Sequence, residues 1–216
     1  MTDVYHHPLR TATMTERLPD EFIANLGELE RTYLAQTEPA RQSGFLGGEA
    51  RWRPERELVL EAVGKDGDFL DVGCANGYLL ECLRNWAAAK GIRLNQFGID
   101  IGKGLIDLAK ARLPEFAANF WAANAWEWKP PRRFRYVYTM TDLVPENMLR
   151  EYLLRLHDEF VETGGRLIVG AYGSYSKNQP ALDVAALLKD LGFTVAGSAK
   201  TGELPISHVA WVEVNG

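Results

Sequence analysis

The chain has 216 residues, of which 46% are hydrophobic and 25% charged, and its formal net charge at pH 7 is −5. This balance is typical of a globular domain with a buried core and excludes a disordered chain. The negative net charge provides no overall attraction to polyanions, so we do not expect nucleic acid as a partner.

The two cysteines, Cys74 and Cys82, lie eight positions apart in one stretch. They are too few for a disulfide scaffold or a zinc site, so we expect free thiols, no metal and a cytoplasmic location. The first twenty residues lack the apolar segment of a signal peptide, and no stretch is long and apolar enough to cross a bilayer. We therefore expect no association with a membrane.

The N-terminal part predicts two helices. The first begins at Asp20 and ends before Pro39, because apolar residues recur at helical spacing. These residues are Phe22, Ile23, Leu26, Leu29, Tyr33 and Leu34. A glycine-rich stretch over 43–48 follows, and Pro54 is expected to begin the second helix. The prediction is a helical cap over residues 1–54 and a main domain over 55–216.

The main domain alternates strands and helices from Gly64 onward. The expected strands are 69–72, 96–100, 118–123, 134–139, 165–170, 193–196 and 207–214. The expected helices are 77–89, 105–113, 145–161 and 181–191. This alternation predicts an α/β fold, a doubly wound and mostly parallel seven-stranded sheet with helices on both faces. Only a loop over 197–205 joins the last two strands, too short for a parallel crossover, so the seventh strand should run antiparallel.

The turn after the first strand is the most informative stretch, and it reads Asp71-Val72-Gly73-Cys74-Ala75-Asn76-Gly77. Gly73 lets the chain turn sharply, and free amides at the start of the next helix face a ligand. The Gly-x-Gly-x-x-Gly spacing of a dinucleotide site is absent. Asp71 would repel a pyrophosphate, whereas it can accept from the ammonium of S-adenosylmethionine (SAM). The electrostatics therefore favour SAM over NAD.

The next two strand ends predict a nucleoside site. Asp100 ends the second strand, where an acidic residue accepts hydrogen bonds from ribose hydroxyls, in NAD and SAM alike. Ile101 is expected to lie against the adenine. After the third strand, Asn124 could bond the adenine edge or only cap a turn. Trp126 could stack on the base or only pack in the core.

These residues resemble the Rossmann-like (class I) SAM-dependent methyltransferases. Asp71–Gly77 is similar to their first motif, Asp/Glu-x-Gly-x-Gly-x-Gly, with Ala75 in place of the middle glycine. Asp100 matches their ribose-binding acid, Asn124 the residue that contacts the adenine amine, and 164–169 their glycine turn into the fifth strand. The resemblance covers about residues 55–214. It implies the sheet order 3-2-1-4-5-7-6, in-line transfer of the methyl group, and an N-terminal cap that shapes the choice of acceptor.

The cofactor-binding residues expected from these arguments are Asp71, Gly73, Cys74, Ala75, Gly77, Tyr78, Asp100, Ile101, Asn124, Ala125, Trp126 and Thr139. The acceptor should lie beyond the fourth and fifth strands. The residues expected to contact it are Thr141, Tyr172, Tyr175 and His208. Asp142 is the candidate catalytic residue, as a general base or an orienting group, and its alternative role is to cap the helix that begins near Pro145.

The sequence thus predicts a methyltransferase that uses SAM to methylate an oxygen or nitrogen of a small molecule. Three alternatives remain at this point. One is a nicotinamide-dependent oxidoreductase, another is a protein that binds SAM without catalysis, and the third, disfavoured by the acidic pI of about 5.5, is an RNA methyltransferase. The sequence leaves the acceptor and the oligomeric state open.

Overall fold

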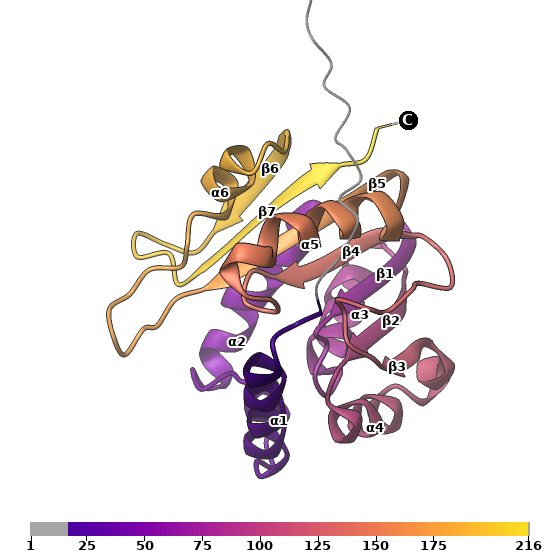
Figure 1. Cartoon of the computed structure of the whole chain (residues 1–216), viewed down its shortest axis with the longest axis vertical. Helices are drawn as coiled ribbons and strands as arrows, with labels where there is room; N and C mark the ends of the chain where they lie inside the picture. Colours follow the sequence, from indigo (N-terminus) through magenta and orange to yellow (C-terminus); the bar gives the residue numbers. More distant parts are fainter. Residues whose placement is uncertain (1–16, 216) are drawn as a thin grey trace, which may run out of the picture.

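The structure, a computed structural model, describes residues 17–215 (Figure 1). Its elements are, in chain order, α1 (Asp20–Leu34), η1 (Arg41–Ser43), α2 (Glu49–Arg56), η2 (Glu57–Ala62), β1 (Gly67–Val72), α3 (Tyr78–Ala89), β2 (Leu94–Asp100), α4 (Lys103–Arg112), η3 (Pro114–Asn119), β3 (Phe120–Ala122), β4 (Phe134–Met140), η4 (Glu146–Met148), α5 (Leu149–Arg155), η5 (Leu156–Phe160), β5 (Val161–Tyr172), α6 (Val184–Asp190), β6 (Val195–Lys200) and β7 (Ser207–Glu213).

The seven strands form one sheet in the order β3-β2-β1-β4-β5-β7-β6. Strands β1 to β5 pair in parallel, whereas β7 pairs antiparallel with both β5 and β6. The predicted order and the antiparallel seventh strand are therefore confirmed. The order reverses at β1 and β4, and ligands of such sheets bind beyond the carboxyl ends of the strands at that point.

Helices cover both faces of the sheet, as predicted. Side chains alternate along each strand, so Leu70 and Val72 of β1 pack on the face that α5 and α6 cover, while Phe69 faces the other side. There Leu80 and Leu83 of α3 fill the second core. The central parallel strands are covered on both sides, which explains the consecutive apolar residues Phe69-Leu70 in β1 and Leu167-Ile168-Val169 in β5.

The N-terminal segments lie along the edge of the sheet where the parallel strands end (Figure 1). Helix α1 docks on the start of α4, where Glu30 Oε1 accepts the backbone N–H of Gly104 at 2.8 Å. A carboxylate at this position stabilises the positive end of the α4 dipole. The predicted first helix is confirmed, while residues 1–16 of the expected cap lie outside the described part.

The second helix differs from the prediction. Helix α2 begins at Glu49, so Pro54 lies inside it and not at its first position. The glycine-rich stretch ends at Gly48, which is the N-cap of α2 and has a φ of 77°. Proline lacks the N–H that would continue the hydrogen-bond ladder, and the helix tightens into a 3₁₀ turn after Arg56. The expected boundary between residues 54 and 55 thus falls within α2.

Other element ends also shift. Strand β3 has three residues because the 3₁₀ turn η3 occupies 114–119, and α6 begins at Val184 with Asp183 as its N-cap. The helix expected over 145–161 becomes η4, α5 and a π-turn, and β5 then begins at Val161 without a loop. Strand β6 extends to Lys200, into the stretch expected to be a loop. Among residues 17–215, no helix is both long and apolar enough to cross a membrane.

Candidate active site

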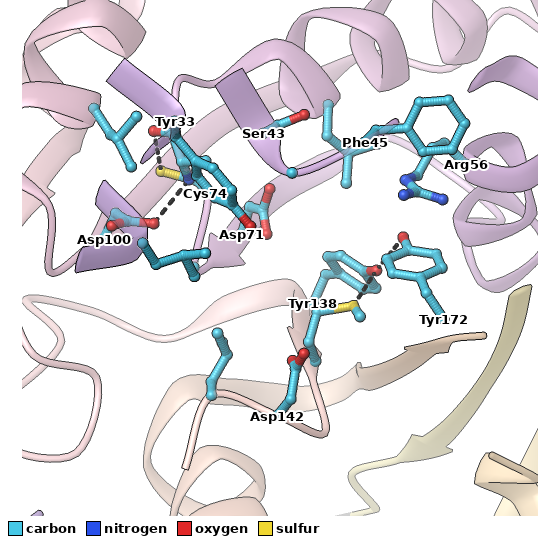
Figure 2. Close-up of a pocket in the computed structure, with 18 of the residues that line it drawn as sticks. Tyr33, Ser43, Phe45, Arg56, Asp71, Cys74, Asp100, Tyr138, Asp142 and Tyr172 are labelled. Atoms are coloured by element: carbon cyan, nitrogen blue, oxygen red, sulfur yellow. Dashed lines mark hydrogen bonds between the residues drawn. The ribbon is translucent and has the colours of Figure 1, made fainter. Parts of the chain in front are cut away.

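A cavity of about 680 Å³ opens at the carboxyl ends of β1, β2, β4 and β5. The turn after β1 forms its floor, and α1, the 43–47 segment and α2 form the opposite wall. Figure 2 shows the side chains that project into it from both sides. This location matches the point where the strand order reverses. Its volume lies within the range of ligand-binding pockets, about 300–1,000 Å³.

The floor is a tight turn held by backbone hydrogen bonds. The N–H groups of Gly73 and Cys74 both donate to the carbonyl of Ile99, at 2.8 and 3.0 Å. Gly73 has a φ of 86°, and a Cβ there would lie 2.8 Å from Leu143 Cδ1. Ala75 also has a positive φ, 45°, where the resembling family has glycine. Its N–H donates to Asp100 Oδ2 at 2.9 Å, which helps to hold this unfavourable backbone conformation.

Asp71 is a buried carboxylic acid that faces the cavity. Asp71 is only 2% exposed, and no other described residue forms a hydrogen bond with its side chain. Burial, and secondarily the charge of Asp100, raises the pKa of Asp71 to about 8. A carboxylate in this position is stabilised only by a cation or a set of donors, and residues 17–215 supply neither. A ligand with an ammonium group would supply the missing charge.

Asp100 is held by the backbone, unlike Asp71. Its two oxygens accept the N–H groups of Ala75 and Gly102, at 2.9 and 2.8 Å. Each carboxylate oxygen has a second lone pair, so two further donors can bind. Burial raises the pKa of Asp100, and the two amide hydrogen bonds oppose that shift. The carboxylate is therefore fixed in orientation and still able to accept from a pair of hydroxyls.

The cavity continues past Ile101 toward Asn124 and Ala125. The side-chain Oδ1 of Asn124 accepts the N–H of Trp126 at 3.0 Å, which closes a turn. The turn-capping alternative for Asn124 is thus present in the structure. The second lone pair of Oδ1 and the amide NH₂ remain for a ligand. Ile101 and Ala125 add apolar surface suited to a flat ring.

The N-terminal helix places an aromatic side chain over this site. Tyr33 of α1 lines the cavity, and its pKa is raised by burial and then by the charges of Asp142 and Asp100. Its hydroxyl contacts Gly44, where an added Cβ would collide with it. A glycine at 44 therefore allows the 43–47 segment to pass close over Tyr33.

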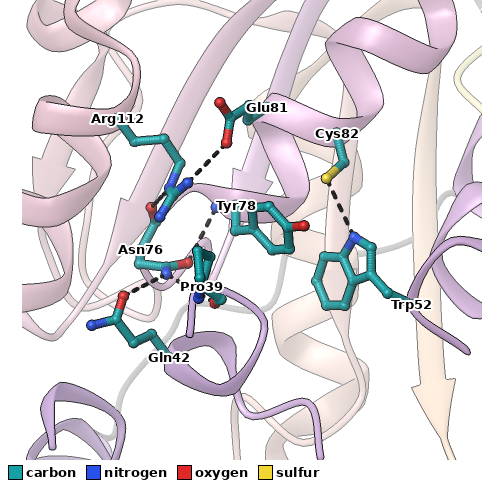
Figure 3. Close-up of polar contacts among 8 residues, drawn as sticks. All are labelled: Pro39, Gln42, Trp52, Asn76, Tyr78, Glu81, Cys82 and Arg112. Atoms are coloured by element: carbon teal, nitrogen blue, oxygen red, sulfur yellow. Dashed lines mark hydrogen bonds and ion pairs between the residues drawn. The ribbon is translucent and has the colours of Figure 1, made fainter. Parts of the chain in front are cut away.

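A buried asparagine ties that segment to the floor (Figure 3). Asn76 is fully buried, and its Nδ2 donates to the carbonyl of Pro39 at 3.0 Å and to Gln42 Oε1 at 3.2 Å. Its Oδ1 accepts the N–H of Tyr78 at the start of α3, at 3.2 Å. Arg112 of α4 donates to the Asn76 carbonyl at 3.2 Å. One side chain thus couples the ligand-binding turn to the N-terminal wall.

The far end of the cavity is aromatic. The hydroxyls of Tyr138, on β4, and Tyr172, at the end of β5, lie 2.8 Å apart. Asp142 follows β4 and projects into the same space (Figure 2). The Asp142 side chain is open to solvent through the cavity, yet the surrounding walls desolvate it partly and raise its pKa. Asp142 does not cap the next helix, because the N-cap of η4 is Pro145 and no side chain bonds it.

Most of the expected site residues line this one cavity. They are Asp71, Gly73, Cys74, Ala75, Asp100, Ile101, Asn124, Ala125, Asp142, Tyr172 and Tyr175. Cys74 is buried, and burial raises the pKa of its thiol well above the usual value, so it is a neutral filler and not a nucleophile. Its sulfur fits against Gly98, where a Cβ would lie 2.7 Å away.

Strand alternation places two expected residues on the wrong side of the sheet. Thr139 is fully buried on the α5 face, where its hydroxyl lies 2.7 Å from that of Tyr152, while the adjacent Tyr138 faces the cavity. His208 faces α6, and its Nδ1 accepts the N–H of Val184 at 3.3 Å. The expectation that Thr139 and His208 face the site was wrong.

Four further expected residues do not line the cavity. Trp126 lies in the core beneath α5 and is 2% exposed, so a stacking role is wrong. Gly77 permits close packing of α3 on Ala109 of α4. Tyr78 stacks on Trp52, with ring centroids 4.8 Å apart, and the N–H of Thr141 donates to the carbonyl of Gly170.

The sequence predicted an N-terminal cap, but it identified neither Tyr138 nor any residue of the cap that lines the cavity. The unpredicted lining residues with charged or aromatic side chains are Glu30, Tyr33, Phe45, Arg51, Trp52, Glu55, Arg56 and Tyr138. The period of two along β4 could have identified Tyr138. No such signal marks Arg56, because the run Arg51-Trp52-Arg53-Pro54-Glu55-Arg56 has the composition of an exposed helix.

No protein-family model matches the chain, and no curated protein is significantly similar to it in sequence. Many solved structures share its fold. One is the N-methyltransferase NodS from Bradyrhizobium japonicum WM9, in complex with S-adenosylhomocysteine (SAH), at a TM-score of 0.66. It is 15% identical, and the match covers 88% of this chain and 98% of NodS.

A second is the 1,6-didemethyltoxoflavin-N1-methyltransferase of Burkholderia thailandensis, with its acceptor and SAH bound. It is 16% identical over 95% of this chain and 94% of that chain, with a TM-score of 0.64. A third, the [4+2]-cyclase SpnF, is 12% identical over 74% of this chain and 81% of its own, with a TM-score of 0.54. The fold is therefore that of the class I SAM-dependent methyltransferases, a fold that also carries other chemistry.

Proposed function

We propose that this chain is a SAM-dependent methyltransferase acting on a small molecule. The observation that carries the proposal is the pair of carboxyl groups on the cavity floor. Asp71 is buried without a hydrogen-bond partner in the described part of the chain, and Asp100 presents two fixed oxygens at the end of the next strand. The first suits an ammonium and the second suits two ribose hydroxyls, which are features of SAM. The neighbours with bound SAH support the same assignment.

In the proposed complex the methionine ammonium pairs with Asp71, and the ribose hydroxyls donate to Asp100. The adenine lies along Ile101 and Ala125, close to Asn124, and Tyr33 covers the ligand from the N-terminal wall. SAM held in this way would supply its methyl group to an acceptor beside Tyr138, Tyr172 and Asp142. These side chains surround the space left for an acceptor.

The reaction is a direct displacement at the methyl carbon. When bound, SAM would supply a methyl group to a lone pair of an acceptor oxygen or nitrogen, with the electrons of the sulfur–methyl bond left on sulfur in the SAH product. The acceptor proton passes to Asp142 or to water. Burial raises the pKa of Asp142, which makes it a better proton acceptor than an exposed aspartate. Alignment of acceptor, methyl and sulfur supplies much of the rate.

Calorimetric titration with SAH and with NADH tests the cofactor assignment. We expect SAH to bind with a one-to-one ratio and NADH not to bind. Binding of NADH without SAH would instead support the nicotinamide-dependent alternative. Incubation with methyl-labelled SAM and candidate acceptors then separates an enzyme from a SAM-binding protein without catalysis.

A cytoplasmic location stays a prediction that rests on the two free cysteines.

A further inference from the structure

Arg56 is a charged side chain buried in the cavity wall. It is the last residue of α2, and its side chain is only 8% exposed. Its guanidinium carbon lies 3.5 Å from the centre of the Tyr172 ring, 4.6 Å from that of Phe45 and 5.2 Å from that of Trp52. Cation–π contacts offset part of the cost of burying this charge, but they leave the N–H donors unsatisfied.

The pairing of Arg56 is incomplete. No hydrogen bond from its guanidinium reaches any residue of 17–215, and Nη1 is buried without a partner. The nearest carboxylate is that of Glu55, 3.6 Å from Nη1, and Arg51 already binds it at 2.6 Å. Two guanidinium groups thus share one carboxylate, which leaves one net positive charge on this part of the wall. Buried arginines normally have planar, bidentate partners.

The position of Arg56 along the cavity separates it from the acidic floor. In Figure 2 Asp71 lies between Asp100 on one side and Arg56 on the other. Arg56 stands over Tyr172, at the end of β5, where the acceptor is expected. The hydroxyl of Tyr172 lies beside that of Tyr138, and both tyrosines line the same space. A negatively charged group entering here would meet, within an aromatic wall, a guanidinium whose only charge partner is a shared carboxylate 3.6 Å away.

We propose that Arg56, with Phe45 and Tyr172, forms a subsite for a carboxylate of the methyl acceptor. The acceptor would then be an organic acid with a flat apolar body, which the aromatic wall contacts. This inference rests on the proposed function, because it assigns the acceptor part of the same cavity. The carboxylate receives two parallel N–H bonds from the guanidinium edge and neutralises the excess positive charge.

The test uses the wild-type chain saturated with SAH, and benzoate and indole-3-carboxylate as probes. Ligand-observed NMR compares each acid with its neutral amide, benzamide or indole-3-carboxamide. We expect the acids to bind at least about tenfold more tightly than the amides, since a charged hydrogen-bonded pair is lost in the amide. Equal affinity for acid and amide, or no binding of either, overturns the proposal without any variant.

Two variants locate the effect. Arg56→Met keeps the length of the side chain and removes the charge, and Arg53→Met is the matched control, because Arg53 on the same helix is exposed and pairs with Glu57. We expect Arg56→Met to lose the preference for acids and Arg53→Met to keep it. Both should bind SAH as the wild type does.

A loss of SAH affinity in Arg56→Met, with 5′-methylthioadenosine affinity unchanged, would assign Arg56 to the cofactor's own carboxylate and overturn the proposal. If the wild type fails to bind SAH at all, the proposed function fails first.

Discussion

At the scale of single residues, Asp71 gives the site its clearest chemical signature. Burial raises its pKa to about 8, so the carboxyl group is mostly protonated in the empty site at pH 7. An ammonium beside it favours the ionised form and lowers that pKa. Binding of SAH should therefore release a proton at neutral pH. The affinity should fall as the pH drops from about 8 to 6, by up to about tenfold per unit.

Calorimetry of SAH binding in two buffers with different ionisation enthalpies measures this proton. Asp71→Asn should bind SAH more weakly and show no proton release between pH 6 and 8. An unchanged affinity in the variant, or a pH-independent affinity in the wild type, would remove Asp71 from the ligand contact.

The same pKa shift predicts how Asp71 affects stability. The folded-state pKa lies above the unfolded value of about 4, so ionisation is disfavoured only in the folded state. Ionisation of Asp71 therefore lowers the free energy of unfolding. This loss of stability is absent below pH 4, grows as the pH rises and is complete above pH 8. Ligand-free Asp71→Asn should thus melt at a higher temperature than the wild type at pH 8.5. The difference in melting temperature should vanish near pH 4. If Asp71→Asn is less stable than the wild type at pH 8.5, Asp71 is not a buried carboxyl group with a raised pKa.

Asp100 is proposed to bind the ribose, and it also holds the N–H groups of Ala75 and Gly102. Its substitution should affect both ligand binding and stability. Asp100→Ala removes the ribose contact and should weaken SAH binding by about 1–3 kcal/mol, as expected for lost charged hydrogen bonds. It also leaves the N–H groups of Ala75 and Gly102 without their acceptor, so the melting temperature should fall as well. Asp100→Asn is the closer comparison, since its single carbonyl oxygen can still accept. A normal SAH affinity in Asp100→Ala would place the ribose elsewhere.

At the scale of elements, the N-terminal wall depends on contacts with the β1–α3 turn. Asn76 Nδ2 is the donor that joins the turn to Pro39 and Gln42. Asn76→Asp keeps the acceptor for the N–H of Tyr78 but removes both of these bonds. We expect faster dissociation of SAH and faster proteolysis between residues 35 and 48. Gln42→Leu removes only one of the two bonds made by Asn76 Nδ2, together with the bond from Gln42 Nε2 to the carbonyl of Gln36, and should have a smaller effect on the dissociation of SAH.

Stopped-flow dissociation and limited proteolysis measure these changes. The control is Thr32→Ala, because Thr32 lies on the exposed side of α1 and bonds only the carbonyl of Glu28. If Asn76→Asp folds yet releases SAH at the wild-type rate, the N-terminal wall does not cover the cofactor.

Some features of the helices and strands could be predicted from local sequence patterns, and others could not. The alternation of strands and helices and the short connection before β7 predicted a mostly parallel sheet with an antiparallel seventh strand, because both depend on local spacing, whereas the strand order was implied by the family resemblance. The start of α2 was missed because the left-handed Gly48 defines it, while Pro54 looked like a helix start. The exposed-looking composition of α2 concealed Arg56, whose burial follows from tertiary packing against Phe45 and Tyr172. Such contacts join distant segments and leave no local period.

At the scale of the whole molecule, charge divides the cavity into two parts. Asp71 and Asp100 come from β1 and β2 and Asp142 from the loop after β4, while the wall above Tyr172 contributes two arginines for one glutamate. The segment over 129–135, which leads into β4, is locally basic, but its three arginines are bound to the protein itself. Arg132 pairs with Asp68, Arg133 with the carbonyl of Val161, and Arg135 with Glu162. Together with the net charge of −5, this favours a small acceptor over nucleic acid.

The most direct test of the whole account is a crystal structure of the chain with SAH. The account predicts the amino group of SAH within hydrogen-bond distance of the Asp71 carboxylate, both ribose hydroxyls on Asp100, and the sulfur directed toward Tyr138 and Tyr172. A ligand bound in another part of the molecule, or SAH seated with its amino group away from Asp71, would contradict it.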